Sequence, residues 1–350
     1  MNRELSTLEL HLAPLQIYLE DPSVTEIVIN RPGEVLTEGR HGWQSYQVAA
    51  ITFAWCLDVA NLVANQASAS ISEEMPLLSA QLPGGERLQV VIPPTVPAGT
   101  VSLTIRRPST NVMSLDAIFA SGAFENTRCV QSIRLDAEER AAIEADLSDA
   151  DKQLLEIFRK KDWRTFLARA ILRRKNIIVS GRTGSGKTTL GNALVSMISA
   201  TERLITVEDV REMRPPHQNV VSMVYTKDAL GVAKTTPKQI FEANLRMRPD
   251  RVIPAELRGD ESFFFVQNVL NSGHPGTVTS IHANSAKMVF QRLAMMIKTS
   301  DEGSGINLPD ILDMLYALLD ITIQMEPTET GQRVVTEIYF DPAYAQKMIG

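Results

Sequence analysis

One short glycine-rich segment constrains the fold of this chain more than any other feature. Residues 181–188 read Gly-Arg-Thr-Gly-Ser-Gly-Lys-Thr and fit the pattern G-x-x-x-x-G-K-[S/T] at every fixed position. The apolar run 176–180 precedes them, and residues 189–195 can continue as a helix. Glycines allow successive backbone N–H groups to point at one anion, and the following helix adds the positive end of its dipole. The segment therefore predicts a phosphate-binding loop between a strand and a helix of a layered α/β fold.

This loop also predicts its ligands. Lys187 is expected to reach the β- and γ-phosphates of a nucleotide, and Thr188 is expected to hold Mg²⁺. ATP and Mg²⁺ are therefore the expected cofactors. The residues expected to bind them are Gly181, Arg182, Thr183, Gly184, Ser185, Gly186, Lys187, Thr188 and Thr189.

Three further apolar runs each end in a polar side chain. The runs are 204–207, 251–255 and 277–281, and the side chains that follow them are Glu208, Glu256 and His282. Ligands of open α/β sheets bind at the carboxyl ends of the strands, so these side chains are expected to share a site with the phosphate loop.

Each of these polar residues has a candidate role. Glu256 is the best candidate for polarising an attacking water. Glu208 is a candidate second acid near the metal or the water, with a helix cap or an ion pair as the alternative. His282 and His274 are candidate sensors of the γ-phosphate, although a structural role stays open for both.

Patterning along the chain predicts two domains. The first residues mix helical patterns, as at 8–19 and 51–67, with strand patterns, which predicts an α+β domain over 1–125. An acidic, alanine-rich segment over 126–152 is expected to be a linker. From 153 to 350, apolar strands alternate with helices, which predicts a sheet covered on both faces.

Composition narrows the classes of function. The net charge of −6 argues against a dedicated DNA-binding surface, which needs a basic face. The two cysteines lie far apart and form no CxxC motif, which fits a reducing cytoplasm. We expect no signal peptide and no membrane span, since no apolar run approaches about 20 residues.

Several segments together resemble a known superfamily, the type II/IV secretion traffic ATPases. Its acidic box, second nucleotide motif and histidine box resemble residues 206–209, 246–251, 255–259 and 272–277. Within the superfamily, the ATPase of type IV secretion and plasmid conjugation systems is the most similar. The segments that carry this likeness are 21–27, 30–34, 85–87 and 104–106.

The resemblance implies a fold and a function. It implies a RecA-like P-loop domain preceded by a smaller α+β domain, in a homo-hexameric ring. The ring would hydrolyse ATP with Mg²⁺ to power secretion or conjugative transfer and pilus assembly, in the cytoplasm at the inner membrane. The implied partners are inner-membrane and other ATPase subunits of that machine, with a membrane surface as a further partner and no strong direct binding of nucleic acid.

The resemblance also implies roles for individual residues. Arg87 and Arg106 match arginines that reach the nucleotide phosphates from the first domain. Glu208 matches the acidic-box glutamate, Glu256 the glutamate of the second motif, and His274 and His282 the histidine box. Pro254 departs from the family, because an aliphatic residue usually stands there, and proline is normally excluded from central strands.

Three alternatives to a motor remain open on the sequence alone. A small-molecule P-loop kinase would need an acceptor site and a lid, and neither has a clear candidate. A nucleic-acid translocase is disfavoured by the acidic charge. A nucleotide-gated scaffold would bind ATP and barely hydrolyse it.

Overall fold

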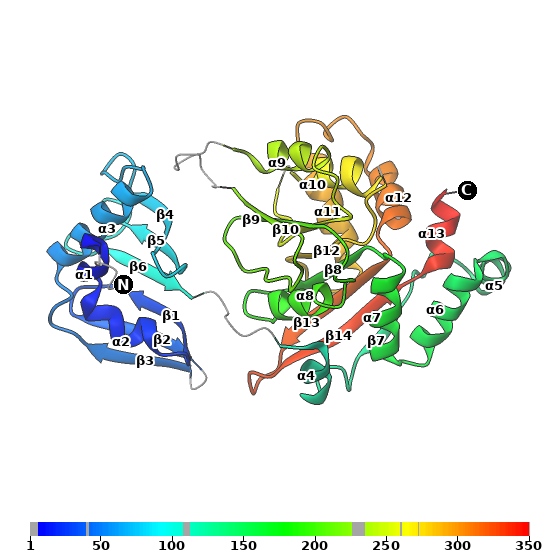
Figure 1. Ribbon diagram of the computed structural model, residues 1–350, viewed down its shortest axis with the longest axis horizontal. Coiled ribbons are helices and arrows are strands. Elements are labelled where there is room, and N and C mark those ends of the chain that lie inside the picture. Colours follow the sequence, from blue (N-terminus) through cyan, green and yellow to red (C-terminus); the bar gives the residue numbers. More distant parts are fainter. Residues whose placement is uncertain are drawn as a thin grey trace. The chain divides into compact units, whose positions relative to one another are not determined.

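A computed structural model describes residues 6–39, 42–107, 113–225, 235–259, 261–271 and 273–349. The described residues form two compact units (Figure 1). The first holds residues 6–107 together with 209–211, 224–225 and 235, and the second holds the others. None of the described helices combines the length and the apolar character that crossing a bilayer requires.

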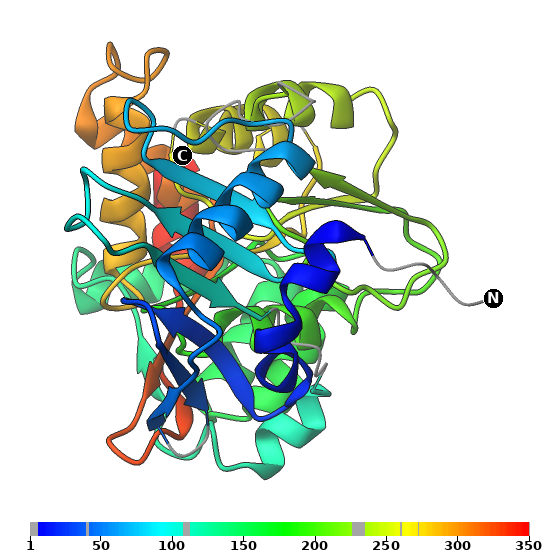
Figure 2. The ribbon, with the colours of Figure 1, turned by 90° about the vertical axis from the view of Figure 1, so that its left-hand side faces the viewer.

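The first unit is built on an antiparallel sheet with the strand order β3-β2-β1-β6-β5-β4. Helix α3 (Phe53–Gln66) lies across one face of this sheet (Figure 2). Its buried side chains Cys56, Val59 and Val63 share an apolar cluster with the inward-facing residues of the strands. The strands are β1 (Val24–Ile29), β2 (Glu34–Gly39), β3 (Gly42–Gln47), β4 (Leu77–Gln81), β5 (Arg87–Val91) and β6 (Ser102–Arg106).

The helical pattern at 8–19 is divided in the structure. Helix α1 (Thr7–His11) begins with a capping box, in which Ser6 and Glu9 bond to each other's backbone N–H. A short 3₁₀ turn, η1 (Ala13–Leu15), and helix α2 (Gln16–Glu20) follow. Pro14 explains the division, because proline cannot donate the backbone bond that a continuous helix needs there.

The second unit contains the predicted parallel strands in two adjoining sheets. One has the order β10-β9-β11, and the other has the order β12-β8-β13-β14-β7. The strands are β7 (Arg128–Val130), β8 (Ile177–Gly181), β9 (Leu204–Glu208), β10 (Val220–Val224), β11 (Arg251–Pro254), β12 (Val278–Ile281), β13 (Ile321–Pro327) and β14 (Arg333–Phe340).

Pro254 lies on the line where the two sheets adjoin. β11 still pairs with β9 through Pro254↔Val207, and the N–H of Ala255 donates to the oxygen of Val207 at 2.9 Å. Successive N–H groups alternate in direction along a strand, so the nitrogen of Pro254 faces β12, where it can donate no bond. Two side-chain hydroxyls of the β12 segment bond to the β11 segment instead, those of Thr277 and Ser280. The strand leading to Glu256 is therefore kept, and the proline interrupts only one of its edges.

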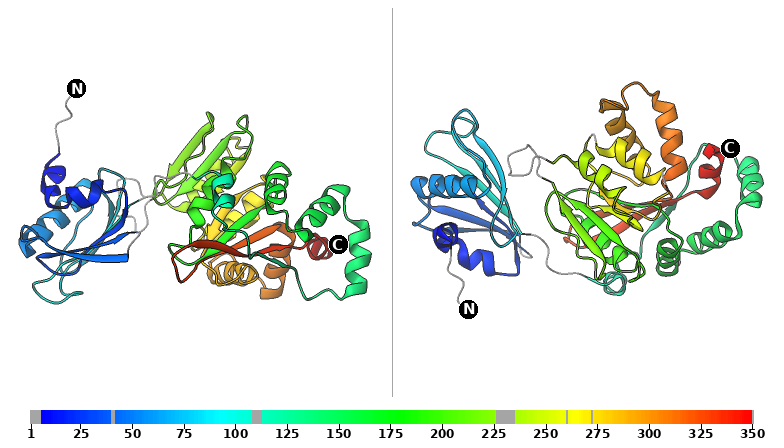
Figure 3. Two further views of the ribbon diagram at one scale, coloured as in Figure 1. Left: turned by 90° about the horizontal axis from the view of Figure 1, so that it is seen from below. Right: turned by 45° about the horizontal axis from the view of Figure 1, so that its top comes forward.

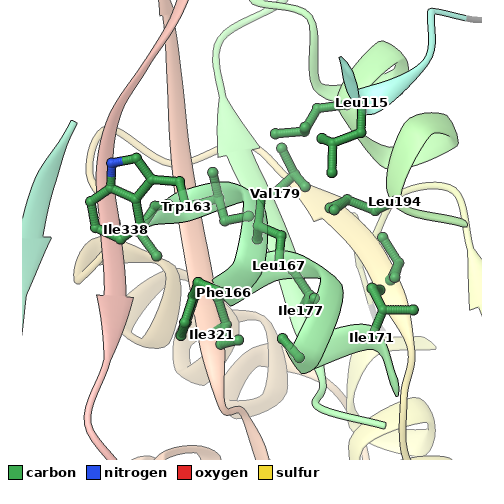
Figure 4. Close-up of a cluster of buried hydrophobic side chains, with 14 of the residues drawn as sticks. Leu115, Trp163, Phe166, Leu167, Ile171, Ile177, Val179, Leu194, Ile321 and Ile338 are labelled. Carbon is green, nitrogen blue, oxygen red and sulfur yellow. The ribbon is translucent and has the colours of Figure 1, made fainter. Parts of the chain in front are cut away.

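Helices cover both faces of these sheets (Figures 1 and 3). On one face, Phe166, Leu167 and Ile171 of α7 pack against Ile177 and Val179 of β8 in a fully buried cluster (Figure 4). The helices are α4 (Leu115–Ala120), α5 (Ala137–Asp146), α6 (Asp149–Arg159), α7 (Trp163–Leu172), α8 (Lys187–Val195), α9 (Pro237–Asn244), α10 (Glu261–Phe265), the π-helical turn η3 (Val266–Leu270), α11 (Met288–Thr299), α12 (Leu308–Leu318) and α13 (Pro342–Ile349).

The segment 126–152, expected to be a linker, differs from that expectation. Its strand β7 pairs in parallel with β14, through Arg128↔Glu337, and α5 and the start of α6 follow it within the second unit. β7 has only three residues, and its partner lies 209 positions further along the chain, so the local sequence shows no strand pattern there. The described residues from 113 to 208 belong to the second unit, so this unit begins earlier than the sequence suggested.

Candidate active site

The phosphate loop leaves β8 with a backbone that requires glycine. Gly181 has φ +150° and Gly186 has φ +96°, both in the region that L side chains avoid. A Cβ on Gly181 would lie 2.3 Å from the backbone oxygen of Met325. Inside the loop, the hydroxyl of Ser185 is buried and has no hydrogen-bond partner among the described residues. The loop is therefore a narrow polar cradle of the kind that a phosphate fills.

Lys187 holds its ammonium group within this cradle. Its Nζ donates to the backbone oxygens of Gly181 at 2.9 Å and of Arg182 at 3.1 Å. Only 8% of the residue is exposed, so its cation acts at the loop and not in bulk solvent. This is the position from which a lysine can neutralise a bound phosphate.

His282 follows β12 and touches the phosphate loop. Its Nδ1 lies 3.1 Å from the backbone oxygen of Gly181 and 3.4 Å from Nζ of Lys187. Burial lowers the pKa of His282, and the positive charges of Lys187 and Arg258 lower it further, while Glu256 opposes them. The ring is therefore neutral at pH 7, when it can both donate and accept a hydrogen bond.

Glu256 lies on the other side of the same imidazole. Its Oε1 is 2.9 Å from Nε2 of His282, and its Oε2 accepts a hydrogen bond from Nε of Arg258 at 2.6 Å. Despite the short contact with the ring, Oε1 is buried and has no well-aligned hydrogen-bond donor among the described residues. One oxygen of this carboxylate is thus held by an arginine, and the other is free to accept a bond from a water.

The carboxylate of Glu208 is buried and accepts hydrogen bonds from nearby residues of the chain. It is 1% exposed, and its Oε2 accepts from the N–H groups of Glu212 and Met213, each at 2.7 Å. Its Oε1 accepts from the hydroxyl of Thr206 at 3.1 Å. Burial raises the pKa of Glu208, although these hydrogen bonds oppose the rise. In this arrangement the carboxyl shapes the turn after β9, and its role as a metal ligand stays a prediction.

Glu212 is the carboxylate that reaches the phosphate loop, and the sequence analysis missed it. Its Oε2 accepts a bond from the hydroxyl of Thr188 at 3.1 Å. Asn192, one turn further along α8, holds the same segment by donating to the backbone oxygen of Glu212 and accepting from the N–H of Arg214. The sequence does show a second acid four residues after Glu208. That its side chain turns back toward α8 is evident only from the structure.

The oxygen atoms around Thr188 fit Mg²⁺. No cluster of three His, Cys, Asp or Glu side chains suited to a metal occurs among the described residues. Mg²⁺ keeps most of its waters and is usually held by one or two protein oxygens together with substrate phosphates. A hydroxyl and a carboxylate beside a phosphate cradle match this pattern better than a closed protein cage would.

Three further predicted residues are His274, in the second unit, and Arg87 and Arg106, in the first. His274 precedes β12 and lies near Gly276, whose N–H donates to Asn176 at the start of β8. This is the amino edge of the strands, whereas His282 lies at the carboxyl edge. In the first unit, Arg87 and Arg106 are direct neighbours across β5 and β6. The roles of these three residues stay predictions.

Comparison with known proteins identifies the family. Residues 144–324 match the family described as "Type II/IV secretion system protein". The chain is 41% identical to the type IV secretion system protein VirB11 of Bartonella henselae, over 100% of this chain and 99% of that protein. The chain belongs to the VirB11 branch of this family. It is thus a secretion ATPase of the traffic ATPase type, as the sequence motifs predicted.

Other relatives agree with this membership. VirB11 of Brucella suis is 36% identical over 97% of this chain and 92% of its own length. The crystal structure of the VirB11 ATPase from the Brucella suis type IV secretion system, in complex with sulphate, covers 98% of this chain and 97% of its own, with 35% identity and a TM-score of 0.54. The pilus retraction motor PilT with bound ADP is 17% identical, covers 98% of this chain and 87% of its own, and has a TM-score of 0.56, which shows the shared fold. An α+β domain followed by a RecA-like ATPase domain is confirmed.

Proposed function

We propose that this secretion ATPase is Mg²⁺-dependent, assembles as a homo-hexameric ring, and powers type IV secretion or conjugative transfer and pilus assembly at the cytoplasmic face of the inner membrane. The observation that carries the catalytic part is the position of His282, which contacts the phosphate loop through Nδ1 and Glu256 through Nε2. One imidazole thereby connects the group that holds phosphate with the group that can hold water.

The chemistry follows from these contacts. The loop N–H groups and Lys187 bind the β- and γ-phosphates, and Oε1 of Glu256 accepts a hydrogen bond from a water. The water oxygen forms a bond to the γ-phosphorus, and the bond from that phosphorus to the β–γ bridging oxygen breaks. The water proton passes to Glu256 and leaves with inorganic phosphate. Thr188, with Glu212 beside it, would hold Mg²⁺, which would supply positive charge to the phosphate oxygens.

Arg258 and His282 position the base. Arg258 holds Oε2 of Glu256, which leaves Oε1 as the oxygen on the side of His282. A neutral ring at His282 adds no further positive charge beside Lys187. The ring can also follow the loop when the γ-phosphate leaves, because it contacts the backbone oxygen of Gly181. We propose that this contact carries the state of the nucleotide to the rest of the second unit.

Similarity to named relatives supports the wider assignment. The relative from Bartonella henselae is named as a type IV secretion system protein, and it is matched along the full chain. The sulphate in the Brucella suis VirB11 crystal structure is a tetrahedral dianion, which resembles a phosphate in shape and charge. Arg87 and Arg106 are kept as proposed phosphate-binding residues, and His274 as a proposed sensor of the γ-phosphate.

Assembly and activity can be tested together. The specific rate of phosphate release should be measured against protein concentration with Mg²⁺, alongside the mass of the particle by light scattering. We expect the rate per subunit to rise steeply and then reach a plateau as hexamers form. A clear rate from particles that remain monomeric would contradict the ring. Transfer of phosphate to a small acceptor, in place of its release, would instead favour a kinase.

A Lys187→Ala variant supplies the matched control. It should keep its thermal stability and its assembly but lose turnover, because the buried cation of the loop is gone. Phosphate release that persists in Lys187→Ala would show that the activity belongs to a contaminant or to another site.

A further inference from the structure

Arg333 begins β14 at the sheet edge that carries the phosphate loop. β13 runs parallel to β8 and sets Met325 opposite Gly181. β14 returns antiparallel to β13 and sets Arg333 opposite Pro327. Arg333 therefore lies two positions beyond the level of Gly181, in the direction in which the loop leaves the sheet.

The side chain of Arg333 lies on the loop side of the sheet. Side chains alternate along a strand, so Arg333 shares a face with Val335, which is buried in the same cluster as Leu190 of α8. A Cβ added to Gly186 would lie 3.0 Å from Cδ of Arg333 and 3.3 Å from Cε of Met325. The stem of the arginine thus packs directly on the residue that precedes Lys187.

The backbone that carries Arg333 is fixed on both sides. It pairs with β13 on one side. On the other side, Nε2 of Gln332 donates to the oxygen of Ser121 at 2.8 Å, and the N–H of Val335 donates to the oxygen of Ala123 at 2.7 Å. An arginine on such a support loses little freedom on binding a ligand, because its backbone and stem are already ordered.

The guanidinium group of Arg333 is available to bind a ligand. Arg333 is exposed, and within the described part of the chain its guanidinium makes no hydrogen bond or ion pair. Guanidinium groups match phosphate oxygens in geometry and charge, and they stay protonated at any physiological pH. An exposed cation whose stem touches the phosphate cradle is suited to a polyanionic ligand of that cradle.

We propose that Arg333 is a nucleotide-binding residue whose guanidinium contacts the phosphate chain held by the loop Gly181–Thr188. The ligand class is nucleoside di- and triphosphates. The inference rests on the assignment of ATP to this loop and adds a second cation beside Lys187, contributed by the β13–β14 hairpin. Sequence motifs do not mark this position, because it lies 146 positions after Lys187.

Equilibrium binding to the full-length chain tests this proposal. The dissociation constants of ADP and of inorganic tripolyphosphate should be measured with Mg²⁺ for the wild type, Arg333→Ala, Arg333→Lys and Arg128→Ala. Arg128 is a matched control, since it is an exposed arginine on the neighbouring strand β7 that pairs with Glu337. We expect Arg333→Ala to weaken both ligands by about 10-fold, as loss of a charged hydrogen bond does, with Arg333→Lys in between and Arg128→Ala unchanged.

Each other outcome overturns the proposal in a recognisable way. Equal affinities in Arg333→Ala and the wild type, at unchanged melting temperature, would show that the guanidinium does not contact the ligand. Weaker ADP binding with unchanged tripolyphosphate binding would move the contact to the base or the ribose. A wild type that binds neither ligand would overturn the ATPase site itself, which is a distinct failure.

Discussion

Nε2 of His282 lies 2.9 Å from Oε1 of Glu256, although the two residues come from different strands that belong to different hydrogen-bonded sheets. The same ring reaches the backbone oxygen of Gly181 with Nδ1. The imidazole therefore spans the line where β11 and β12 adjoin, and it connects the phosphate loop with the carboxylate proposed to activate water. The predictions below follow from this contact and from the turn after β9, which bonds to α8 through Glu212.

The protonation of His282 should set the acid limb of the rate. Burial, Lys187 and Arg258 lower the pKa of this ring, and Glu256 opposes them. The neutral form is therefore kept until the pH falls below the ordinary histidine value of about 6.5. We expect kcat/KM to fall only below that value, and this limb should be missing from the lower, flatter profile of His282→Gln. A midpoint above about 6.5 in the wild type would contradict the assignment.

Removing the charge of Glu212 should change the Mg²⁺ requirement. The carboxylate accepts a bond from Thr188, so it holds the hydroxyl proposed to bind the metal. We expect Glu212→Gln to raise the Mg²⁺ concentration for half-maximal rate by about 10-fold, a usual size for residues that support metal ligands. Glu329→Gln is the control, because Glu329 is an exposed carboxylate in the β13–β14 turn. Equal Mg²⁺ dependence in both variants would remove Glu212 from the site.

Substitution of Glu208 should lower the stability of the fold more than it changes the binding of Mg²⁺. Alanine at this position would leave the N–H groups of Glu212 and Met213 without the acceptor that they share. We expect Glu208→Ala to reduce the free energy of unfolding by about 2–4 kcal/mol, since unpaired buried donors cost about 1–3 kcal/mol each. Glu208→Gln should lose less, because its amide oxygen still accepts both bonds. A higher Mg²⁺ requirement in Glu208→Gln, at unchanged melting temperature, would favour a metal ligand.

Two glycines of the loop and its helix should respond oppositely to alanine. Gly186 has φ +96°, and a Cβ there would crowd Arg333 and Met325, so Gly186→Ala should abolish tight ADP binding. Gly191 lies inside α8, and a Cβ there would meet no atom within 4 Å. Gly191→Ala should therefore keep ADP binding and stabilise the chain by up to about 1 kcal/mol, as helix propensity predicts. Thermal melting and ADP titration check both variants, and ADP binding by Gly186→Ala as tight as in the wild type would contradict the described loop.

The site residues at the carboxyl ends of the strands could be predicted, because each lies close in sequence to the apolar strand that positions it. Each of the apolar strands β8, β9, β11 and β12 has a polar residue at its carboxyl end or within two residues of it, and the loop motif fixes the direction of the site. Glu256, His282 and Lys187 were therefore expected near each other, and they are found together. The family's motifs sharpened this expectation from an α/β layer to a secretion ATPase.

The rest depended on contacts that sequence spacing does not encode. Glu212 reaches Thr188 only because Glu208 folds the turn after β9 back toward α8. Arg333 reaches the loop only because β13 and β14 add to β8 more than 140 residues later, as in the contact between Ser180 and Gln324. In the sequence, Pro254 seemed to disrupt its strand. In the structure, β11 keeps its pairing with β9, and only the edge that faces β12 lacks a backbone N–H. Long-range pairing decides all three positions.

The most direct test of this account compares phosphate release by the wild type and Glu256→Gln at equal nucleotide occupancy. Both proteins should first be titrated with ATP in the presence of Mg²⁺ and then followed through a single turnover. The account predicts equal affinities and a rate reduced by about 10²–10⁴-fold in Glu256→Gln, the usual contribution of a positioned base. A Glu256→Gln variant that releases phosphate at the wild-type rate would contradict the assignment of Glu256 as the residue that activates water.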